Sequence, residues 1–170
     1  MARHTEPLTL MRNHRDGSFE DVSMTLAKLP AHSSRGVAFG DVDNDGRVDV
    51  LILNVGEPPS LLLNRSDDHN HRVLFKLVGT KGNKAAIGAR IAVKTGSETQ
   101  IDEVRGGSSY ISQNDLRVHF GLGSSESINE VDVRWPNGAT EVLKNVAADF
   151  IYTVDEGEGI KQKLPLASLP

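Results

Sequence analysis

The sequence predicts an all-β protein that is divided into two parts. Short runs of β-branched and apolar residues alternate with clusters of Gly, Asn, Asp, Ser and Pro, which is the pattern of strands joined by turns. No segment has the 3.6-residue apolar period of a long helix. At 170 residues the chain is long enough for one ordinary domain or two small ones.

Strands are expected wherever apolar residues cluster between these turn signals. Apolar and polar residues alternate most clearly in 90–94 and 130–135, which predicts one buried and one exposed face for each strand. The sequence Trp135-Pro136-Asn137-Gly138 predicts a hairpin turn in which Asn-Gly supplies the positive φ angles, and residues 124–129 are a candidate for one turn of helix. The expected strands are residues 8–12, 19–26, 36–39, 48–53, 60–63, 73–78, 89–95, 100–105, 117–120, 130–135, 140–143 and 150–154.

A polar segment near the middle of the chain predicts a linker over residues 65–71. The first part then covers residues 1–64 and the second covers 72–157, and residues 158–170 are expected to form a frayed or loosely packed tail. His69 and His71 could be read as a metal-binding pair. No further ligands lie near them in the sequence, so a solvated linker is the favoured interpretation.

Composition excludes several classes of protein. The 38% hydrophobic and 25% charged content is typical of a globular chain, and the net charge of -4 without a basic patch argues against nucleic-acid binding. The absence of cysteine excludes disulfides, thiolate nucleophiles and zinc-thiolate sites. No apolar run reaches the roughly 18 residues of a membrane span. The first seven residues also lack the apolar segment of a signal peptide, so no export signal is expected in this chain.

The most informative motif is the acidic loop, Asp41-Val42-Asp43-Asn44-Asp45-Gly46-Arg47-Val48-Asp49. Ca²⁺ takes about 6–8 hard oxygen ligands, and a short loop with carboxylates at alternate positions can wrap around the ion. The ligands predicted here are the carboxylates of Asp41, Asp43, Asp45 and Asp49 and the main-chain carbonyl of Arg47. Gly46 would let the backbone reverse, and without a cation these carboxylates would repel one another.

The flanks of this loop decide which calcium motif it resembles. An EF-hand needs a helix on each side and a Glu at its twelfth position, but that position is Ile52 and both flanks are expected strands. A dockerin-type loop fails at the same residue. The alternative is an ordinary polar hairpin turn, although such a turn does not require carboxylates at Asp41, Asp43 and Asp49.

Other polar residues leave an enzymatic alternative open. Glu103, Asp115, Glu130 and Asp132 could supply the two carboxylates of a glycoside hydrolase, or they could simply be solvent-facing strand residues. A serine hydrolase built on Ser108 or Ser109 with His119 is disfavoured because the chain has no Gly-x-Ser-x-Gly elbow.

A polar cluster and the tryptophan could each have a binding role or a structural role. Tyr110, Gln113, Asn114 and Asp115 form a polar cluster that could bind a sugar or a partner loop, or hold a loop by hydrogen bonds. Trp135 is expected in the core or the hairpin, with a sugar-stacking platform as the alternative.

The acidic loop and its flanks resemble a known repeat. Phe39-Gly40-Asp41-Val42-Asp43-Asn44-Asp45-Gly46-Arg47-Val48-Asp49-Val50 is similar to an FG-GAP/VCBS repeat, the calcium-loop unit of integrin-type β-propellers. Residues 10–22 resemble the strand and turn that open such a unit, and residues 60–64 resemble its close. This resemblance implies that the first part is a partial, propeller-blade-like sheet with a calcium turn.

Residues from about 72 to 157 resemble an ASPIC/UnbV domain. The matching blocks are Leu77-Val78-Gly79-Thr80, Ala86-Ile87-Gly88-Ala89-Arg90, residues 106–115, His119-Phe120-Gly121-Leu122-Gly123 and residues 133–138. With both similarities in this order, the chain resembles the cartilage acidic protein family and its bacterial relatives. This resemblance implies a β-sandwich for the second part. That family carries a long propeller ahead of this domain, whereas about one blade is present here. Since propeller units normally bury their faces against neighbours, we expect a C-terminal piece of a longer protein, or a blade that packs against the second domain or another copy.

The resemblance also implies a function. Such proteins are secreted or cell-surface, bind calcium, and act in adhesion or recognition without catalysis. The expected partners are a protein or a carbohydrate ligand, with self-association also open, and the expected role of calcium is structural. The rival expectation is a carbohydrate-active hydrolase that uses Glu103, Asp115 or Asp132.

Overall fold

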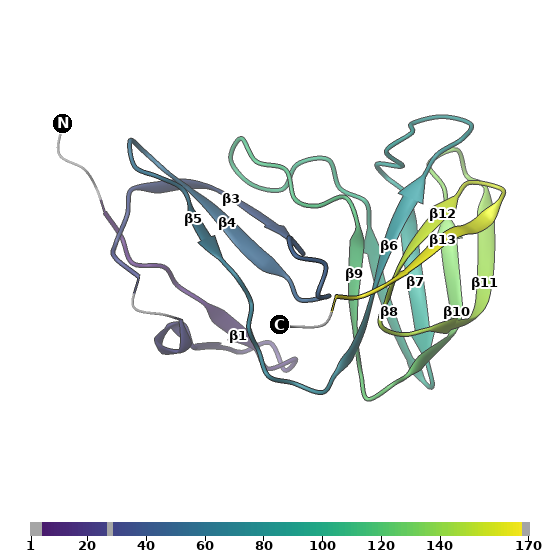
Figure 1. Ribbon diagram of the computed structural model, residues 1–170, viewed down its shortest axis with the longest axis horizontal. Coiled ribbons are helices and arrows are strands. Elements are labelled where there is room, and N and C mark those ends of the chain that lie inside the picture. Colours follow the sequence, from purple (N-terminus) through teal and green to yellow (C-terminus); the bar gives the residue numbers. More distant parts are fainter. Residues whose placement is uncertain (1–4, 27–28, 168–170) are drawn as a thin grey trace.

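The computed structural model describes residues 5–26 and 29–167 and confirms the all-β prediction. The strands form separate open sheets, and one short 3-10 helix, η1 (Ser23–Thr25), lies in the N-terminal part. Figure 1 shows an N-terminal unit and a C-terminal unit side by side. Residues 1–4, part of the segment in which no export signal is expected, lie outside the described residues. Residues 168–170, the end of the expected tail, also lie outside them.

The N-terminal unit contains a hairpin and a three-stranded sheet. Strand β1 (Met11–Asn13) pairs with β2 (Phe19–Asp21), and the sheet has the order β3 (Ser34–Gly40), β4 (Asp49–Asn54), β5 (Ser60–Leu62). All of these pairs are antiparallel.

This N-terminal sheet has almost no core of its own. Ile52 is the only hydrophobic side chain that is buried in the described part of residues 1–64. Leu51, Leu53 and Leu61 remain 39%, 48% and 49% exposed. Hydrophobic burial therefore contributes little to holding this unit together, and other contacts must fix its shape.

The C-terminal unit is a sandwich of two four-stranded sheets. One sheet has the order β11 (Thr140–Ala147), β10 (Ser127–Arg134), β7 (Arg90–Thr95), β8 (Glu98–Glu103), and the other has the order β13 (Gly159–Pro165), β12 (Phe150–Asp155), β6 (His71–Val78), β9 (Val118–Gly123). Neighbouring strands are antiparallel except β6 and β12, which run parallel. The alternation predicted for 90–94 and 130–135 appears as cross-strand pairs, such as Val133 opposite Ile91.

The sandwich core lies between these two sheets. Phe75 is fully buried; its ring stacks on Tyr152 with centroids 5.7 Å apart and meets Phe120 edge-on at 6.3 Å. Trp135 is only 1% exposed, and its Nε1 donates to Glu141 Oε1 at 3.0 Å. The expectation that Trp135 belongs to the core is confirmed, and a sugar-stacking role for its ring is excluded by its burial.

Three sequence-based expectations are wrong. Most of the expected tail, 158–170, is strand β13, which pairs antiparallel with β12 after a turn that contains Gly157 at positive φ. The candidate helical turn at 124–129 does not form, because Ile128 is already buried in β10 opposite Val146.

The third correction concerns the hairpin at residues 135–139. Gly138 has a φ of 90°, whereas Asn137 does not adopt a positive φ. Trp135 N donates to Ala139 O at 2.8 Å, so the loop is longer than the predicted Asn-Gly turn. Asn137 instead supports this loop through its side chain, since Oδ1 accepts from Ala139 N at 3.0 Å.

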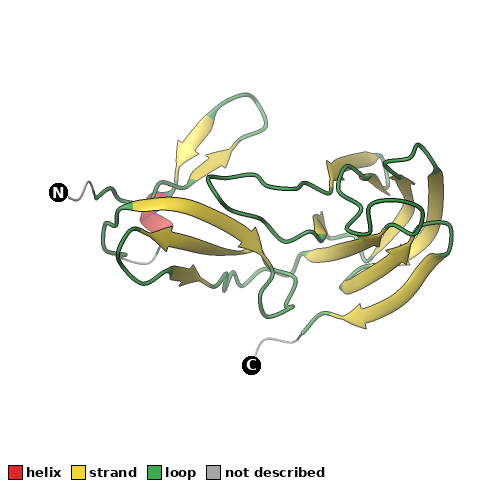
Figure 2. Cartoon of the chain, turned by 90° about the horizontal axis from the view of Figure 1, so that it is seen from above, coloured by secondary structure: helices red, strands yellow, loops and turns green. Residues whose placement is uncertain are grey.

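Two segments connect the units. Residues 63–70 have no regular secondary structure, as expected for a linker, although His71 already belongs to β6. The long loop between β8 and β9 extends back over β3 (Figures 1 and 2). Gly36 permits this close approach, because a Cβ there would lie 2.6 Å from Ser112 Oγ and 3.0 Å from Tyr110 O.

Candidate metal centre

The acidic loop connects β3 to β4 at the side of the N-terminal sheet that faces the sandwich. Gly40 and Asp49 are paired across the two strands, so the ends of the loop are held together. Asn44 and Gly46 have φ angles of 61° and 81°, which are the left-handed conformations that Asn and Gly tolerate best. The loop therefore folds back on itself and directs several carboxylates inward.

Three of the predicted ligands come together. Asp41, Asp43 and Asp49 each offer a carboxylate oxygen, and these oxygens lie within 4.8 Å of one another. Asp41 is 4% exposed and Asp49 is 1% exposed, whereas the side chain of Asp43 is 34% exposed. Carboxylates this close to one another favour a bound cation over the free state.

Backbone amides hold the two buried carboxylates in place. Asp41 accepts from the N–H groups of Asp45 at 3.0 Å and Gly46 at 2.8 Å. Asp49 accepts from Val42 N at 2.9 Å and from Asn64 N at 2.8 Å, which also ties the end of β5 to the loop. Burial raises the pKa of Asp41 above its ordinary value, although the Gly46 amide and the charge of Arg117 act in the opposite direction.

The other two predicted ligands are engaged differently. Asp45 is buried, but its Oδ1 accepts from Arg47 N at 2.8 Å and its Oδ2 lies 3.3 Å from Arg47 Nη1. It is not part of the group of three converging carboxylates. A metal-binding role for Asp45 and for the carbonyl of Arg47 stays a prediction.

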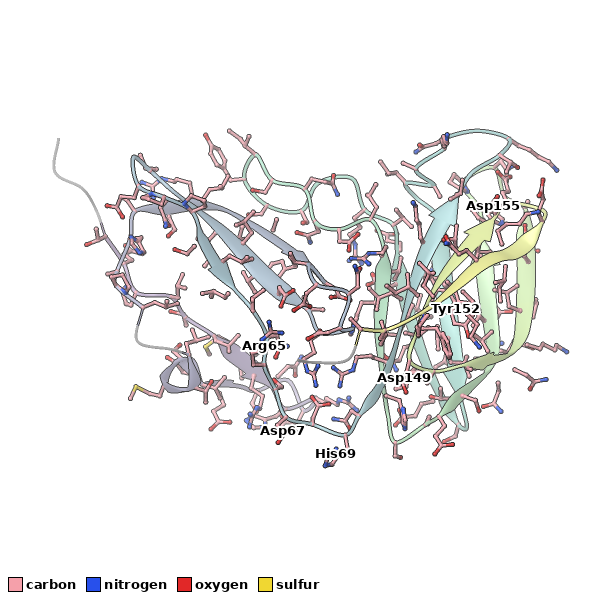
Figure 3. All side chains as sticks on the ribbon, viewed as in Figure 1. Arg65, Asp67, His69, Asp149, Tyr152 and Asp155 are labelled. Carbon is pink, nitrogen blue, oxygen red and sulfur yellow. The ribbon has the colours of Figure 1, made fainter. Side chains whose placement is uncertain are left out.

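Arg65 is a residue of this site that the sequence argument missed. Its Nη1 lies 2.9 Å from Asp43 Oδ2 and 3.3 Å from Asp45 Oδ2. Arg65 follows β5 on the connection that also carries Asp67 and His69 (Figure 3). The hydrogen bond from Arg65 lowers the pKa of Asp43, and the same bond raises the pKa of Arg65. Its partners Asp43 and Asp45 lie 22 and 20 residues earlier in the chain, so no local motif points to this contact.

The residues present fit a hard divalent cation. All the converging atoms are carboxylate oxygens, the ligand type that calcium prefers. Asp43 Oδ1 is buried without a hydrogen-bond partner, the single such side-chain atom found among the residues that the structure describes. Each carboxylate has about four lone-pair sites, so the amide bonds to Asp41 and Asp49 leave acceptor capacity for an ion.

The sandwich contacts the acidic loop directly. Arg117 Nη2 donates to the carbonyl of Asp41 at 2.6 Å, and its Nη1 donates to Asn44 Oδ1 at 2.7 Å. His119 Nε2 donates to the carbonyl of Gly46 at 2.8 Å, which requires the proton to sit on Nε2 because a carbonyl only accepts. Burial lowers the pKa of His119. His119 therefore engages the loop and not a serine hydroxyl.

The candidate catalytic carboxylates are only partly brought together. Glu103 and Asp115 line one pocket of about 270 Å³ between the two units. Asp132 lies elsewhere, on β10, where Lys94 Nζ contacts it at 2.7 Å and contacts Glu130 at 2.5 Å. Asp115 is itself paired with Arg117 at 2.5 Å. The structure thus brings Glu103 near Asp115 in that pocket and Glu130 near Asp132 around Lys94, and it keeps the two pairs apart.

The remaining polar candidates have structural partners. His71 Nδ1 lies within hydrogen-bond distance of Asp149 Oδ2, at 2.6 Å. In the predicted polar cluster, Gln113 Nε2 donates to the carbonyls of Arg105 and Asn114, and Asn114 Oδ1 accepts from Phe39 N at 3.1 Å. Tyr110 stays 65% exposed at the tip of the loop.

Comparison with known proteins agrees with this architecture. The family described as ASPIC and UnbV matches residues 79–161, and the family described as FG-GAP-like repeat matches residues 1–52. The FG-GAP-like similarity thus falls on the N-terminal unit, and the ASPIC and UnbV similarity falls on the sandwich. The resemblance predicted from the sequence is thereby confirmed.

Among curated proteins, the chain is similar to cartilage acidic protein 1 from three vertebrates. Identity over 153 residues is 31% for Homo sapiens, 30% for Mus musculus and 32% for Xenopus tropicalis. The alignments cover 86% of this chain but only 22% to 23% of the relatives. The chain thus spans less than a quarter of the length of these relatives. No helix within residues 5–26 and 29–167 is long and apolar enough to cross a membrane.

Proposed function

We propose that this chain is a calcium-stabilised, non-enzymatic adhesion or recognition module. The observation that supports this most directly is the convergence of oxygens from Asp41, Asp43 and Asp49 within 4.8 Å, beside a buried Asp43 oxygen that lacks a partner. Calcium would be structural, since it would neutralise the acidic loop and fix its shape. Asp45 and the carbonyl of Arg47 complete the proposed ligand set.

The proposed domain organisation follows the sequence argument. Residues 1–64 form the FG-GAP/VCBS-like repeat, 65–71 the linker, and 72–157 the ASPIC/UnbV-like sandwich, to which β13 adds a further strand. The matched relatives are named as acidic proteins of cartilage, and by analogy with them we place this module outside the cell or at its surface.

A groove between the two units is the recognition surface that the geometry favours. It has a volume of about 940 Å³ and is bounded by Asp43 and Asn44 of the acidic loop on one side. Across its floor, Lys76, Thr153 and Gln162 form a row on three adjacent strands, because Thr153 is paired with both of the others. These amide, hydroxyl and ammonium groups suit a protein or carbohydrate ligand.

Thermal unfolding in calcium and in chelator tests the calcium proposal. A ligand that binds only the folded state at about 100 times its Kd stabilises it by about 2.7 kcal/mol. We therefore expect calcium to raise the melting temperature of the wild type, and expect Asp49→Ala to remove this increment. Asp67→Asn, an exposed acid of the linker, serves as the charge-matched control and should behave as the wild type. Identical melts with and without calcium, together with no heat in titration calorimetry, would refute calcium binding.

The enzymatic alternative rests on the shared pocket of Glu103 and Asp115. A panel of chromogenic glycosides with Glu103→Ala and Asp115→Ala tests it, and Asp132→Ala is the control because Asp132 lies outside that pocket. Turnover that both pocket variants lose and the control retains would favour the hydrolase over the recognition module.

Self-association is a further part of the proposal. The exposed side chains of Leu51, Leu53 and Leu61 and the edge strand β5 of the N-terminal sheet offer a surface for a second copy. Size-exclusion chromatography with multi-angle light scattering, with and without calcium, measures the oligomeric state. A mass of 18.4 kDa at all concentrations would exclude this part.

A further inference from the structure

We propose that Arg117 and His119 of the sandwich are positioning residues of the acidic loop, so that calcium binding and docking of the two units form one coupled equilibrium. This inference rests on the proposed function. Neither residue offers an oxygen ligand, and neither belongs to the repeat that carries the loop. Their effect on the ion would be exerted through the backbone of the loop.

Arg117 joins the loop to the sandwich by several bonds at once. Its Nη2 donates to Asp41 O at 2.6 Å, and its Nη1 donates to Asn44 Oδ1 at 2.7 Å. Its Nε donates to Asp115 Oδ2 at 2.6 Å, which fixes the plane of the guanidinium. The side chain is 18% exposed, so these bonds are largely shielded from water. Because the plane of the Arg117 guanidinium is fixed, its N–H groups determine where the acceptor oxygens of the loop must lie.

Further groups of the C-terminal unit hold the rest of the loop. His119 Nε2 donates to Gly46 O at 2.8 Å, and Ala167 N donates to Asn44 O at 2.7 Å. The aliphatic part of Arg72 packs on Gly46 so closely that a Cβ at Gly46 would lie 2.6 Å from Arg72 Cδ. Three loop carbonyls, at Asp41, Asn44 and Gly46, are thus held by the other unit.

The amides of the same loop point the other way. The N–H groups of Val42, Asp45 and Gly46 donate to the carboxylates of Asp49 and Asp41. The carbonyls of this stretch face the sandwich and its amides face the carboxylates, so a peptide plane cannot rotate without losing bonds on both sides. The positions of the Asp41 and Asp49 oxygens consequently depend on the sandwich contacts.

The weak core of the N-terminal sheet makes this coupling significant. Among the described residues of that sheet, Ile52 is the one buried hydrophobic residue. The sheet therefore has little apolar packing to fix its orientation relative to the sandwich. Docking relies on the loop contacts and on Phe39, whose carbonyl accepts from Asp115 N at 2.9 Å. Coupling between two binding events is reciprocal, so an ion that orders the loop must strengthen docking by the factor by which docking strengthens ion binding.

The experiment measures calcium affinity and docking separately in the full chain. Titration calorimetry with CaCl₂ gives the affinity of the wild type, Arg117→Ala, Arg117→Lys and His119→Ala. Amide hydrogen exchange at Asp115 and Ala167 reports docking, because these N–H groups donate across the joint to Phe39 O and Asn44 O. Arg134→Ala, an exposed cation on β10, is the matched control. The fluorescence of Trp135, the single tryptophan, verifies that the sandwich remains folded.

We expect Arg117→Ala to lose about tenfold to a hundredfold in calcium affinity, the range found when a residue that orients metal ligands is removed. Arg117→Lys should recover part of this loss. Calcium should slow exchange at Asp115 and Ala167 in the wild type and do so less in Arg117→Ala. If the Arg117 variants unfold, Asn44→Gly removes the acceptor Oδ1 while tolerating the positive φ, and the same loss of affinity is expected.

Two negative results are distinguishable. Wild type and variants that bind calcium equally well, or exchange at Asp115 and Ala167 that is insensitive to calcium, would overturn the coupling while leaving the proposed function intact. A wild type that binds no calcium would overturn the proposed function and the coupling together. A purely structural role for Arg117 would lower the melting temperature without changing the calcium affinity of the folded protein, and it too would overturn the inference.

Discussion

Arg65 Nη1 lies 2.9 Å from Asp43 Oδ2, so a guanidinium already compensates part of the negative charge of the acidic loop. A protein cation and a metal ion near the same carboxylate compete electrostatically. Arg65 would therefore protect the metal-free loop from repulsion, at some cost to calcium affinity.

The first prediction follows from this competition. Arg65→Ala should lower the melting temperature in chelator and raise calcium affinity about fivefold, which is the scale of an exposed ion pair. Arg65→Lys retains the charge and should stay close to the wild type. Titration calorimetry and melting in chelator provide the two values, and weaker calcium binding by Arg65→Ala would show that Arg65 supports the ion and does not compete with it.

A second prediction concerns the crowding around Gly46. Gly46→Ala should destabilise the chain by about 2–5 kcal/mol, since a left-handed non-Gly residue costs about 1–2 kcal/mol and overpacking costs about 1–3 more. Gly138→Ala is a matched control with a φ of 90° and no atom within 4 Å of the added Cβ. It should incur only the backbone part of the cost. Urea unfolding of both variants checks the difference, and equal losses would mean that the joint is not tightly packed.

A third prediction concerns pH and Glu156, which is 3% exposed. Its Oε2 accepts from Lys81 N and Thr80 N at 3.0 Å each, and its Oε1 accepts from Asn137 Nδ2 at 2.5 Å. The Lys81 amide is the main cause that lowers the pKa of Glu156 below 4.5. Since the folded pKa is below the unfolded one, the stabilisation is complete above pH 4.5 and is lost as pH falls through the folded value.

Glu156→Gln should accordingly lower the melting temperature at pH 7 by several degrees. The variant's melting temperature should also fall less steeply than that of the wild type between pH 5 and pH 3, a range that brackets the ordinary pKa of 4.5. Differential scanning calorimetry across this range measures both effects. Glu98→Gln, at an exposed position of β8, is the control. An unchanged acid decline in Glu156→Gln would assign the acid sensitivity to other carboxylates.

A fourth prediction contrasts the two units. Phe75→Ala should cost about 3–5 kcal/mol, because Phe75 is fully buried and contacts two other rings. Leu53→Ala should cost less than about 1 kcal/mol, because that side chain is 48% exposed. Equilibrium unfolding of the two variants compares the values. A large loss in Leu53→Ala would indicate that a partner or second copy covers the N-terminal sheet.

Local pattern predicted most of the fold. The alternation around Val93 and Val133 located β7 and β10, and the acidic run at 41–49 located the turn between β3 and β4. Strand β13 was missed because Lys161 and Lys163 interrupt its apolar pattern; it is an edge strand whose residues are mostly exposed. Edge strands commonly carry lysine, so their sequences look like loops.

The environment of the acidic loop was less predictable than the loop itself. Asp41, Asp43 and Asp49 share a local motif, so their convergence follows from short-range geometry. Arg65, Arg117 and His119 reach the loop only through tertiary structure, and a single sequence carries no signal for such contacts. The same limit applied to Glu103 and Asp115, whose shared pocket no spacing could predict.

The parallel pairing of β6 with β12 has a consequence for how the chain acquires its structure. Val73 meets Phe150 only after the long segment between them has left the ribosome, and such distant pairings close slowly. The N-terminal unit therefore emerges before the sandwich that contacts its acidic loop is complete. Association of nascent chains through the undocked N-terminal sheet is the hazard that this topology creates, and a chaperone that shields that sheet would improve the yield of native protein.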